Sequence, residues 1–183
     1  MDETDRKKAT MPTPSKRATA AANAARGEGA LFYAYPTPHG PITIRSFNGA
    51  VTDVALGDVQ LDGMRKPSAA TNAAATQIQE YLAGKRRAFD LRLDLRGSDF
   101  QQEAWRAVAE IPYGTCLTCA QLAERMGRTG SHRAVGAAVR ANPLAIIVPA
   151  HRVTSANGKP LGTGRPAAVK GALLKMEMDN LAK

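Results

Sequence analysis

Hydrophobic and polar residues alternate along residues 42–47 and again along 50–56, with Asn48-Gly49 between the two runs. Asn-Gly in this setting is a strong hairpin signal, because both central residues of the tight turn need a positive φ. Residues 72–84 place apolar side chains on one helical face and end at a glycine, which predicts a helix. Residues 88–97 alternate strictly and predict a further strand.

The second half of the chain has helical periodicity instead. Residues 99–111 carry one apolar stripe and stop at a Pro-Tyr-Gly turn. Residues 118–127 open with Thr118 and have Gln121 three positions later, a capping-box signature. Residues 131–142 follow, with Ser131 as the predicted N-cap and Asn142-Pro143 as the stop. Two short helices joined by a tight turn predict a helix-turn-helix.

The second of these helices is unusual in its small side chains, which are Ala134, Gly136, Ala137 and Ala138. A helix with such a surface approaches another backbone closely. The pattern leaves open whether that partner is another helix or DNA.

Together these elements indicate an α+β protein in three parts. Residues 1–29 are rich in alanine, threonine and basic residues and cannot bury a core, so we expect a disordered basic tail. Residues 30–95 form a small domain of sheet plus helix. Residues 96–183 form a mostly helical domain that contains the helix-turn-helix.

Charge adds a candidate partner. The net charge is +9, and residues 96–183 hold twelve basic and six acidic side chains. This excess indicates a polyanionic partner, most simply nucleic acid, although a solvated basic surface explains it equally well. No signal peptide and no long apolar segment is evident. We therefore expect a cytoplasmic protein, nucleoid-associated in a bacterium, without a membrane partner.

The two cysteines, Cys116 and Cys119, have C-x-x-C spacing. A second cysteine pair is missing and the three histidines are scattered, so we expect no metal site and no cofactor. A thioredoxin-like redox pair would follow a strand and open a helix in a different chain pattern. The pair is interpreted as two reduced thiols.

From about Gly97 to Glu177 the chain resembles the O6-alkylguanine-DNA alkyltransferases and their alkyltransferase-like relatives. The motifs are FQQEAWRAVAEIPYG, QLAERMG, RAVGAAVRANP, IIVPAHRV and VKGALLKME, in this order. Single pieces are weak signals, but the ordered set is specific. The resemblance implies a ribonuclease-H-like N-terminal domain, a winged helix-turn-helix that binds double-stranded DNA in the minor groove, and a lesion base that is flipped out of the stack.

The resemblance also assigns roles. Arg133 matches the arginine that fills the space of the flipped base, with a phosphate contact as the alternative. His151 matches the histidine that activates the acceptor cysteine, Glu177 the carboxylate that orients it, and Asn142 the asparagine beside the active-site loop. The further DNA contacts it implies are Thr118, Cys119, Ser131, Ala134, Gly136, Ala137 and Arg140. The lesion pocket it implies consists of Cys119, Val148, Pro149, Ala150, Thr163 and Gly164.

Three positions depart from the family pattern. Ala150 stands where the acceptor cysteine belongs, and a methyl group cannot attack carbon. Cys119 and Thr163 stand where tyrosines usually contact the guanine, so reach and stacking area are lost. An artificial Cys-to-Ala change would not explain the last two, so natural loss of the cysteine is favoured.

The sequence therefore predicts an alkyltransferase-like protein that binds O6-alkylguanine lesions as a monomer, transfers no alkyl group and hands the lesion to other factors, such as nucleotide-excision repair proteins. One alternative is a methylated-DNA–protein-cysteine methyltransferase in an inactive form or using Cys119, whose thiol pKa a helix N-terminus would lower. The other is a transcription regulator that uses only the helix-turn-helix.

Overall fold

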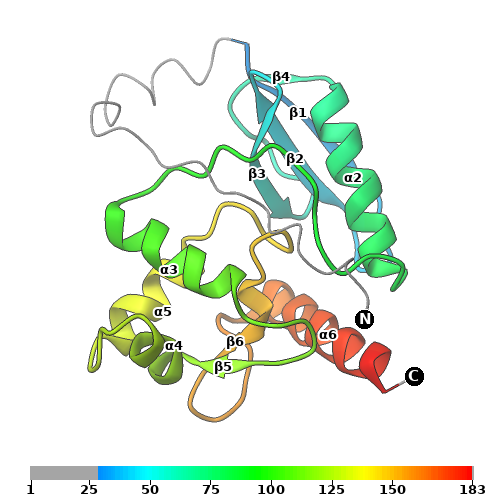
Figure 1. Cartoon of the computed structure of the whole chain (residues 1–183). Helices are drawn as coiled ribbons and strands as arrows, with labels where there is room; N and C mark the ends of the chain where they lie inside the picture. Colours follow the sequence, from blue (N-terminus) through cyan, green and yellow to red (C-terminus); the bar gives the residue numbers. More distant parts are fainter. Residues whose placement is uncertain (1–28, 183) are drawn as a thin grey trace, which may run out of the picture.

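The N-terminal half of the molecule is a four-stranded sheet with one helix on its face (Figure 1). The computed structural model describes residues 29–182, so the predicted basic tail lies outside the described residues except for Gly29. The strand order is β3-β2-β1-β4, and only β1 and β4 pair in parallel. The strands are β1 (Leu31–Tyr35), β2 (Ile42–Phe47), β3 (Ala50–Leu56) and β4 (Met64–Arg65).

The predicted hairpin is confirmed. β2 and β3 pair antiparallel, and Asn48 and Gly49 between them have φ values of 48° and 74°. Positive φ values at both central residues give a two-residue turn a twist that matches the right-handed twist of its flanking strands.

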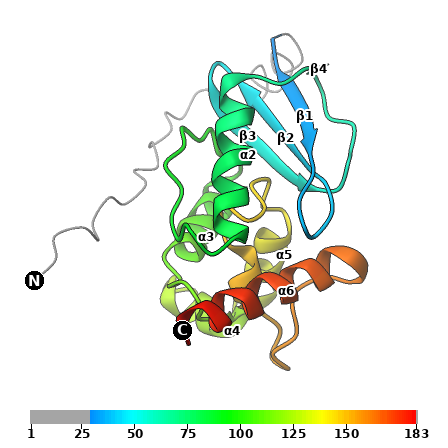
Figure 2. The ribbon, with the colours of Figure 1, turned by 90° about the vertical axis from the view of Figure 1, so that its right-hand side faces the viewer.

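The predicted helix is also present, as α2 (Ala69–Leu82), which begins three residues before the predicted start. Ser68 caps it in a box with Thr71, each side chain bonding the backbone of the other. Gly84 follows with a φ of 72°. α2 covers one face of the sheet, which Figures 1 and 2 show from two sides.

The strand predicted over residues 88–97 is wrong. This segment makes a single parallel bridge, between Leu93 and Val51 of β3, with hydrogen bonds of 2.8 and 2.9 Å. The pairing cannot extend further along β3, because the next residue on that edge, Val54, is already hydrogen-bonded to residues 143–145. Even so, Phe89, Leu91, Leu93 and Leu95 pack against the core, as their alternation predicted.

The C-terminal half is mostly helical, as predicted, and the α+β class is confirmed. Thr118 and Gln121 form the predicted capping box. The short strands β5 and β6 pair in parallel beside the helix-turn-helix. The elements are α3 (Asp99–Ala109), β5 (Leu117–Thr118), α4 (Cys119–Arg125), α5 (His132–Arg140), the 3-10 turn η1 (Ala150–Arg152), β6 (Val153–Thr154) and α6 (Gly164–Leu181).

Ser131 precedes α5 as predicted, but it makes no capping hydrogen bond. Its backbone has φ −88° and ψ 19° instead of the extended values of a normal N-cap, because its amide closes a turn onto Arg128. The Ser131 hydroxyl is therefore not used by the helix.

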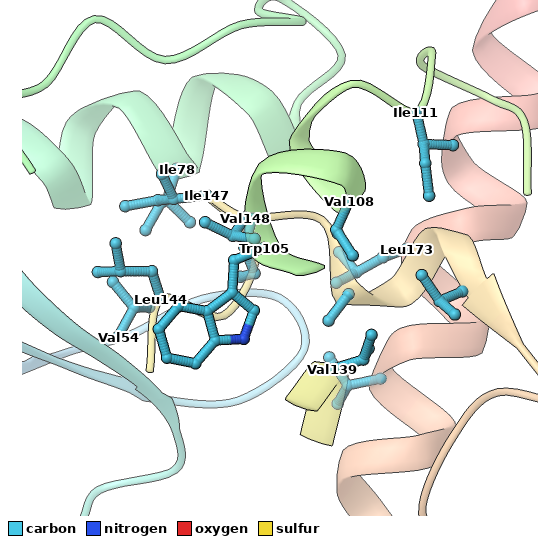
Figure 3. Close-up of a cluster of buried hydrophobic side chains, with 14 of the residues drawn as sticks. Val54, Ile78, Trp105, Val108, Ile111, Val139, Leu144, Ile147, Val148 and Leu173 are labelled. Carbon is cyan, nitrogen blue, oxygen red and sulfur yellow. The ribbon is translucent and has the colours of Figure 1, made fainter. Parts of the chain in front are cut away.

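One apolar cluster joins the sheet, the helix-turn-helix and α6 (Figure 3). Trp105 lies in the middle of it, 2% exposed, and its indole N–H donates to the carbonyl of Ala138 at 2.8 Å. The cluster includes Val54 and Ile78 from the N-terminal half and Leu173 from α6, so the core is continuous across residue 95. The predicted division into two domains at that residue stays a prediction. Among the described residues, no helix has the length and apolar character needed to cross a membrane.

Candidate functional site

The carboxylate of Glu177 is buried at the point where four segments meet. Its side chain comes from α6 and is 0% exposed. Arg152 donates to it from Nε and Nη2 at 2.8–3.1 Å, and the backbone N–H of Gly114 donates at 2.8 Å. His151 lies 3.0 Å away through Nε2, and the Tyr81 hydroxyl of α2 also donates to it. The predicted His151–Glu177 pair is thus in contact.

Electrostatics fix the protonation of this pair. Burial alone would raise the pKa of Glu177, but hydrogen bonds from His151 and Arg152 outweigh it and lower the pKa to about 2. Burial lowers the pKa of His151, against the opposing effect of Glu177. At neutral pH the cluster therefore holds an ionised carboxylate, a guanidinium and a neutral imidazole.

Asn142 braces the loop that leads to position 150. Its side-chain Nδ2 donates to the carbonyl of Val148 at 2.9 Å, and its Oδ1 accepts from the N–H of Leu144 at 3.0 Å. Within the loop Ile146 has a φ of 72°, a strained value for a β-branched residue. The loop is also bonded to the sheet, since the N–H of Val54 donates to the carbonyl of Pro143 at 2.7 Å.

The side chain that this loop carries at position 150 has no reactive atom. Ala150 is buried, 6% exposed, and directly precedes His151. Val148 and Pro149 are buried beside it. The loop thus places a methyl group where the resemblance puts a thiol.

The outer face of α5 is a compact set of exposed side chains, Arg133, Ala134, Ala137 and Arg140. Gly136 and Ala138 are buried along the two edges of this face. A Cβ added at Gly136 would lie 3.4 Å from the sulfur of Cys119, so this edge of α5 packs against the start of α4. The small residues of α5 therefore pack against α4 at one edge and leave a low, exposed face on the outer side of the helix.

The expectation that Cys119 has a lowered thiol pKa is wrong. Cys119 is the first residue of α4, but burial raises its pKa by more than the nearby Arg140 lowers it. The thiol is therefore a poor nucleophile at neutral pH. Cys116 is exposed.

Thr163 and Gly164 begin α6 and are exposed, and the Thr163 side chain makes no capping bond. Among residues 29–182, no group of three or more His, Cys, Asp or Glu side chains is placed to hold a metal ion.

The structure adds two groups that sequence reasoning missed, the Tyr81 hydroxyl and the Gly114 N–H. The PYG turn and the helical face of α2 signalled packing, but nothing in the pattern pointed to a carboxylate far along the chain.

Comparisons with known proteins agree with the geometry. The family described as "6-O-methylguanine DNA methyltransferase, DNA binding domain" matches residues 99–179. A methylated-DNA–protein-cysteine methyltransferase of Mycobacterium tuberculosis (strain H37Rv) is 39% identical over 145 residues, 77% of this chain and 88% of that protein. One from Methanosarcina barkeri is 44% identical over 108 residues, 59% of this chain and 68% of that protein.

Solved structures give the same result. The crystal structure of the M. tuberculosis O6-methylguanine methyltransferase has a TM-score of 0.77 at 36% identity, covering 82% of this chain and 94% of that one. The M. tuberculosis OGT in complex with DNA has a TM-score of 0.75 at 38% identity, with the same coverage.

Glu177→Gln should destabilise the protein strongly, because it leaves the Arg152 guanidinium buried without its counter-charge. A cost of about 3–5 kcal/mol is expected for breaking such a pair, roughly 10 °C in Tm. Thermal unfolding at pH 7 measures it. The control is Glu103→Gln, which breaks a more exposed ion pair with Arg128 and should cost much less, because water screens such a pair. Equal costs for the two variants would contradict the central role of Glu177.

The same pair sets a pH dependence. The pKa of Glu177 is depressed in the folded protein to about 2. Its stabilising contribution is therefore complete above the unfolded pKa of about 4.3 and is lost as the pH falls toward 2. The free energy of unfolding of the natural protein should decline across that window by more than that of Glu177→Gln, which has no carboxyl group to protonate.

Proposed function

Because this chain belongs to the methylated-DNA–protein-cysteine methyltransferase family, we propose that it recognises O6-alkylguanine in double-stranded DNA and holds the lesion without taking the alkyl group. The observation that carries the proposal is Ala150: the loop, its brace and the His151–Glu177 pair are present, and the nucleophile is not. Alkyl transfer needs a sulfur at that position to displace the guanine oxygen from carbon.

The exposed face of α5 supports the DNA-binding part of the proposal. Arg133 and Arg140 stand at its two ends with two alanine methyls between them, a low cationic surface. Such a surface suits the narrow minor groove, where Arg133 would enter the stack in place of the flipped base. One of the related proteins was solved in complex with DNA, which supports DNA as the partner here.

On this proposal the protein acts as a monomer in the cytoplasm or on the nucleoid, and the lesion is removed by another class of enzyme. Nucleotide-excision repair proteins fit that role, since they act on a marked strand without reversing the lesion. A protein that stays bound to the lesion without removing the alkyl group would mark the damaged strand for these enzymes.

A methyltransferase that uses Cys119 is the second candidate, favoured by the names of the relatives. The raised thiol pKa weighs against it. A transcription regulator that reads base sequence is the third candidate. The outer face of α5 carries no Asn or Gln, so it has few groups that could hydrogen-bond to base edges.

The deciding experiment compares binding to matched duplexes with and without one O6-methylguanine, followed by mass measurement of the protein. We expect tighter binding to the lesion duplex, no gain of a methyl group, and strong weakening with salt because phosphate contacts release counterions. Methyl gain at Cys119 would favour the second candidate. Equal affinity for both duplexes would favour the third.

Arg133→Ala should weaken lesion binding on the order of 30–100-fold, because it removes the stack-filling group as well as a charge. The matched control is Arg106→Ala, which removes an exposed arginine on α3 that is bonded only to Gln102 among the described residues. A salt slope lower by about one with unchanged lesion preference would reduce Arg133 to a phosphate contact.

Ala150→Cys should make methyl transfer detectable, because the imidazole of His151 already stands beside position 150 in its neutral form. Transfer should be slow, since neither Cys119 nor Thr163 supplies a phenol to hold the base in line. Adding Cys119→Tyr and Thr163→Tyr should raise the rate by more than the separate effects combined. Single-turnover transfer read by protein mass is the measurement. A triple variant that binds lesion DNA but gains no methyl group would show that the network is not a dormant active site.

A further inference from the structure

A hydroxyl from the N-terminal half enters the buried cluster. Tyr81 lies near the end of α2 and is 0% exposed. Its oxygen is 3.0 Å from Nε2 of His151 and also bonds Oε1 of Glu177. Among the described residues, the other donors to this carboxylate are Gly114, His151 and Arg152, all in the C-terminal half. Tyr81 is therefore the contribution of α2 to the site.

The protons of the cluster have one arrangement that avoids contact between two acceptors. Glu177 is ionised and only accepts, and burial raises the pKa of Tyr81, so the phenol keeps its proton and donates it to Oε1. Nε2 of His151 lies 3.0 Å from both oxygens. A bare Nε2 would turn a lone pair toward the carboxylate. The ring proton therefore sits on Nε2, and Nδ1 carries the lone pair.

We propose that Tyr81 is a positioning residue for His151, whose hydroxyl shares the Glu177 oxygen and keeps the imidazole neutral, in the Nε2–H form, with Nδ1 as its acceptor. Among residues 29–182, Nδ1 has no hydrogen-bond partner. The inference rests on the proposed role of the His151–Glu177 pair, and its test needs neither DNA nor alkyl transfer.

The effect of the hydroxyl follows from the charges around the ring. Glu177 of α6 favours the imidazolium, and Arg152 of η1 and Lys170 of α6 oppose it. By donating to Oε1, the hydroxyl of Tyr81 takes up part of the carboxylate charge that would otherwise act on His151. Its removal leaves that charge to the imidazole and should make protonation easier.

Nitrogen NMR of the histidine rings tests this directly. The chain has three histidines, and His39→Gln and His132→Gln identify the His151 signals. We expect a protonated Nε2 and a bare Nδ1 at neutral pH. In Tyr81→Phe, which keeps the packed ring, the midpoint of His151 titration should rise by about one pH unit, a tenfold change in the ratio of the two forms.

Tyr113→Phe is the matched control. Tyr113 packs edge-on against Tyr81 with ring centroids 6.1 Å apart, but its hydroxyl accepts from Asn180 at 3.2 Å and lies outside the cluster. It should leave the His151 signals and titration unchanged.

A natural protein with the proton on Nδ1 would overturn the inference without any variant, so a poorly folded Tyr81→Phe does not remove the test. A folded Tyr81→Phe whose His151 signals and titration match those of the control would reduce Tyr81 to a packing residue. Absence of lesion preference in the natural protein, with these ring signals as expected, would overturn the proposed function and leave the role of Tyr81 standing.

Discussion

The buried carboxylate of Glu177 is the constraint on which the rest of this structure depends. An ionised group with no exposure to water must find donors inside the protein, because an unpaired charge there is very costly. Its donors come from α2, from the turn after α3, and from η1. Meeting that single requirement fixes the position of α6 against both halves of the chain and turns His151 toward the interior.

A second set of contacts holds the loop that leads to Ala150. The outer edge of β3 is shared between residues 92–94 and 143–145, so the sheet holds the strained segment before Ala150 from outside, and Asn142 holds it from within. A β-branched residue at a φ of 72° persists only where its surroundings determine it. The N-terminal half therefore shapes the site even though it carries none of the family motifs.

Local patterns predicted the local features of this fold. The Asn48-Gly49 turn and the Thr118 capping box depend on neighbours within a few residues, and both were predicted correctly. The prediction of a strand over residues 88–97 failed because a segment 51 residues later, around Leu144, pairs with the same edge of β3, which alternation cannot reveal. The expectation of a lowered thiol pKa at Cys119 failed for a similar reason, since burial raises that pKa and the sulfur lies against Gly136 of another helix. The His151–Glu177 contact was reached through the family motif, and the Tyr81 contact, 96 residues from Glu177, had no sequence signal.

The presence of the network beside Ala150 does not by itself indicate chemistry. Removing a thiol from a buried loop costs little, because the methyl group of alanine leaves no charge unpaired and no donor unsatisfied. Removing Glu177 or Arg152 would strand a charge in the core, so folding alone retains both. His151 and Tyr81 differ from them, because a neutral ring at either position could be replaced by an apolar one at a smaller cost. The protonation state of His151 is therefore the property that separates a site kept ready for a reacting group from a charge cluster kept only for stability.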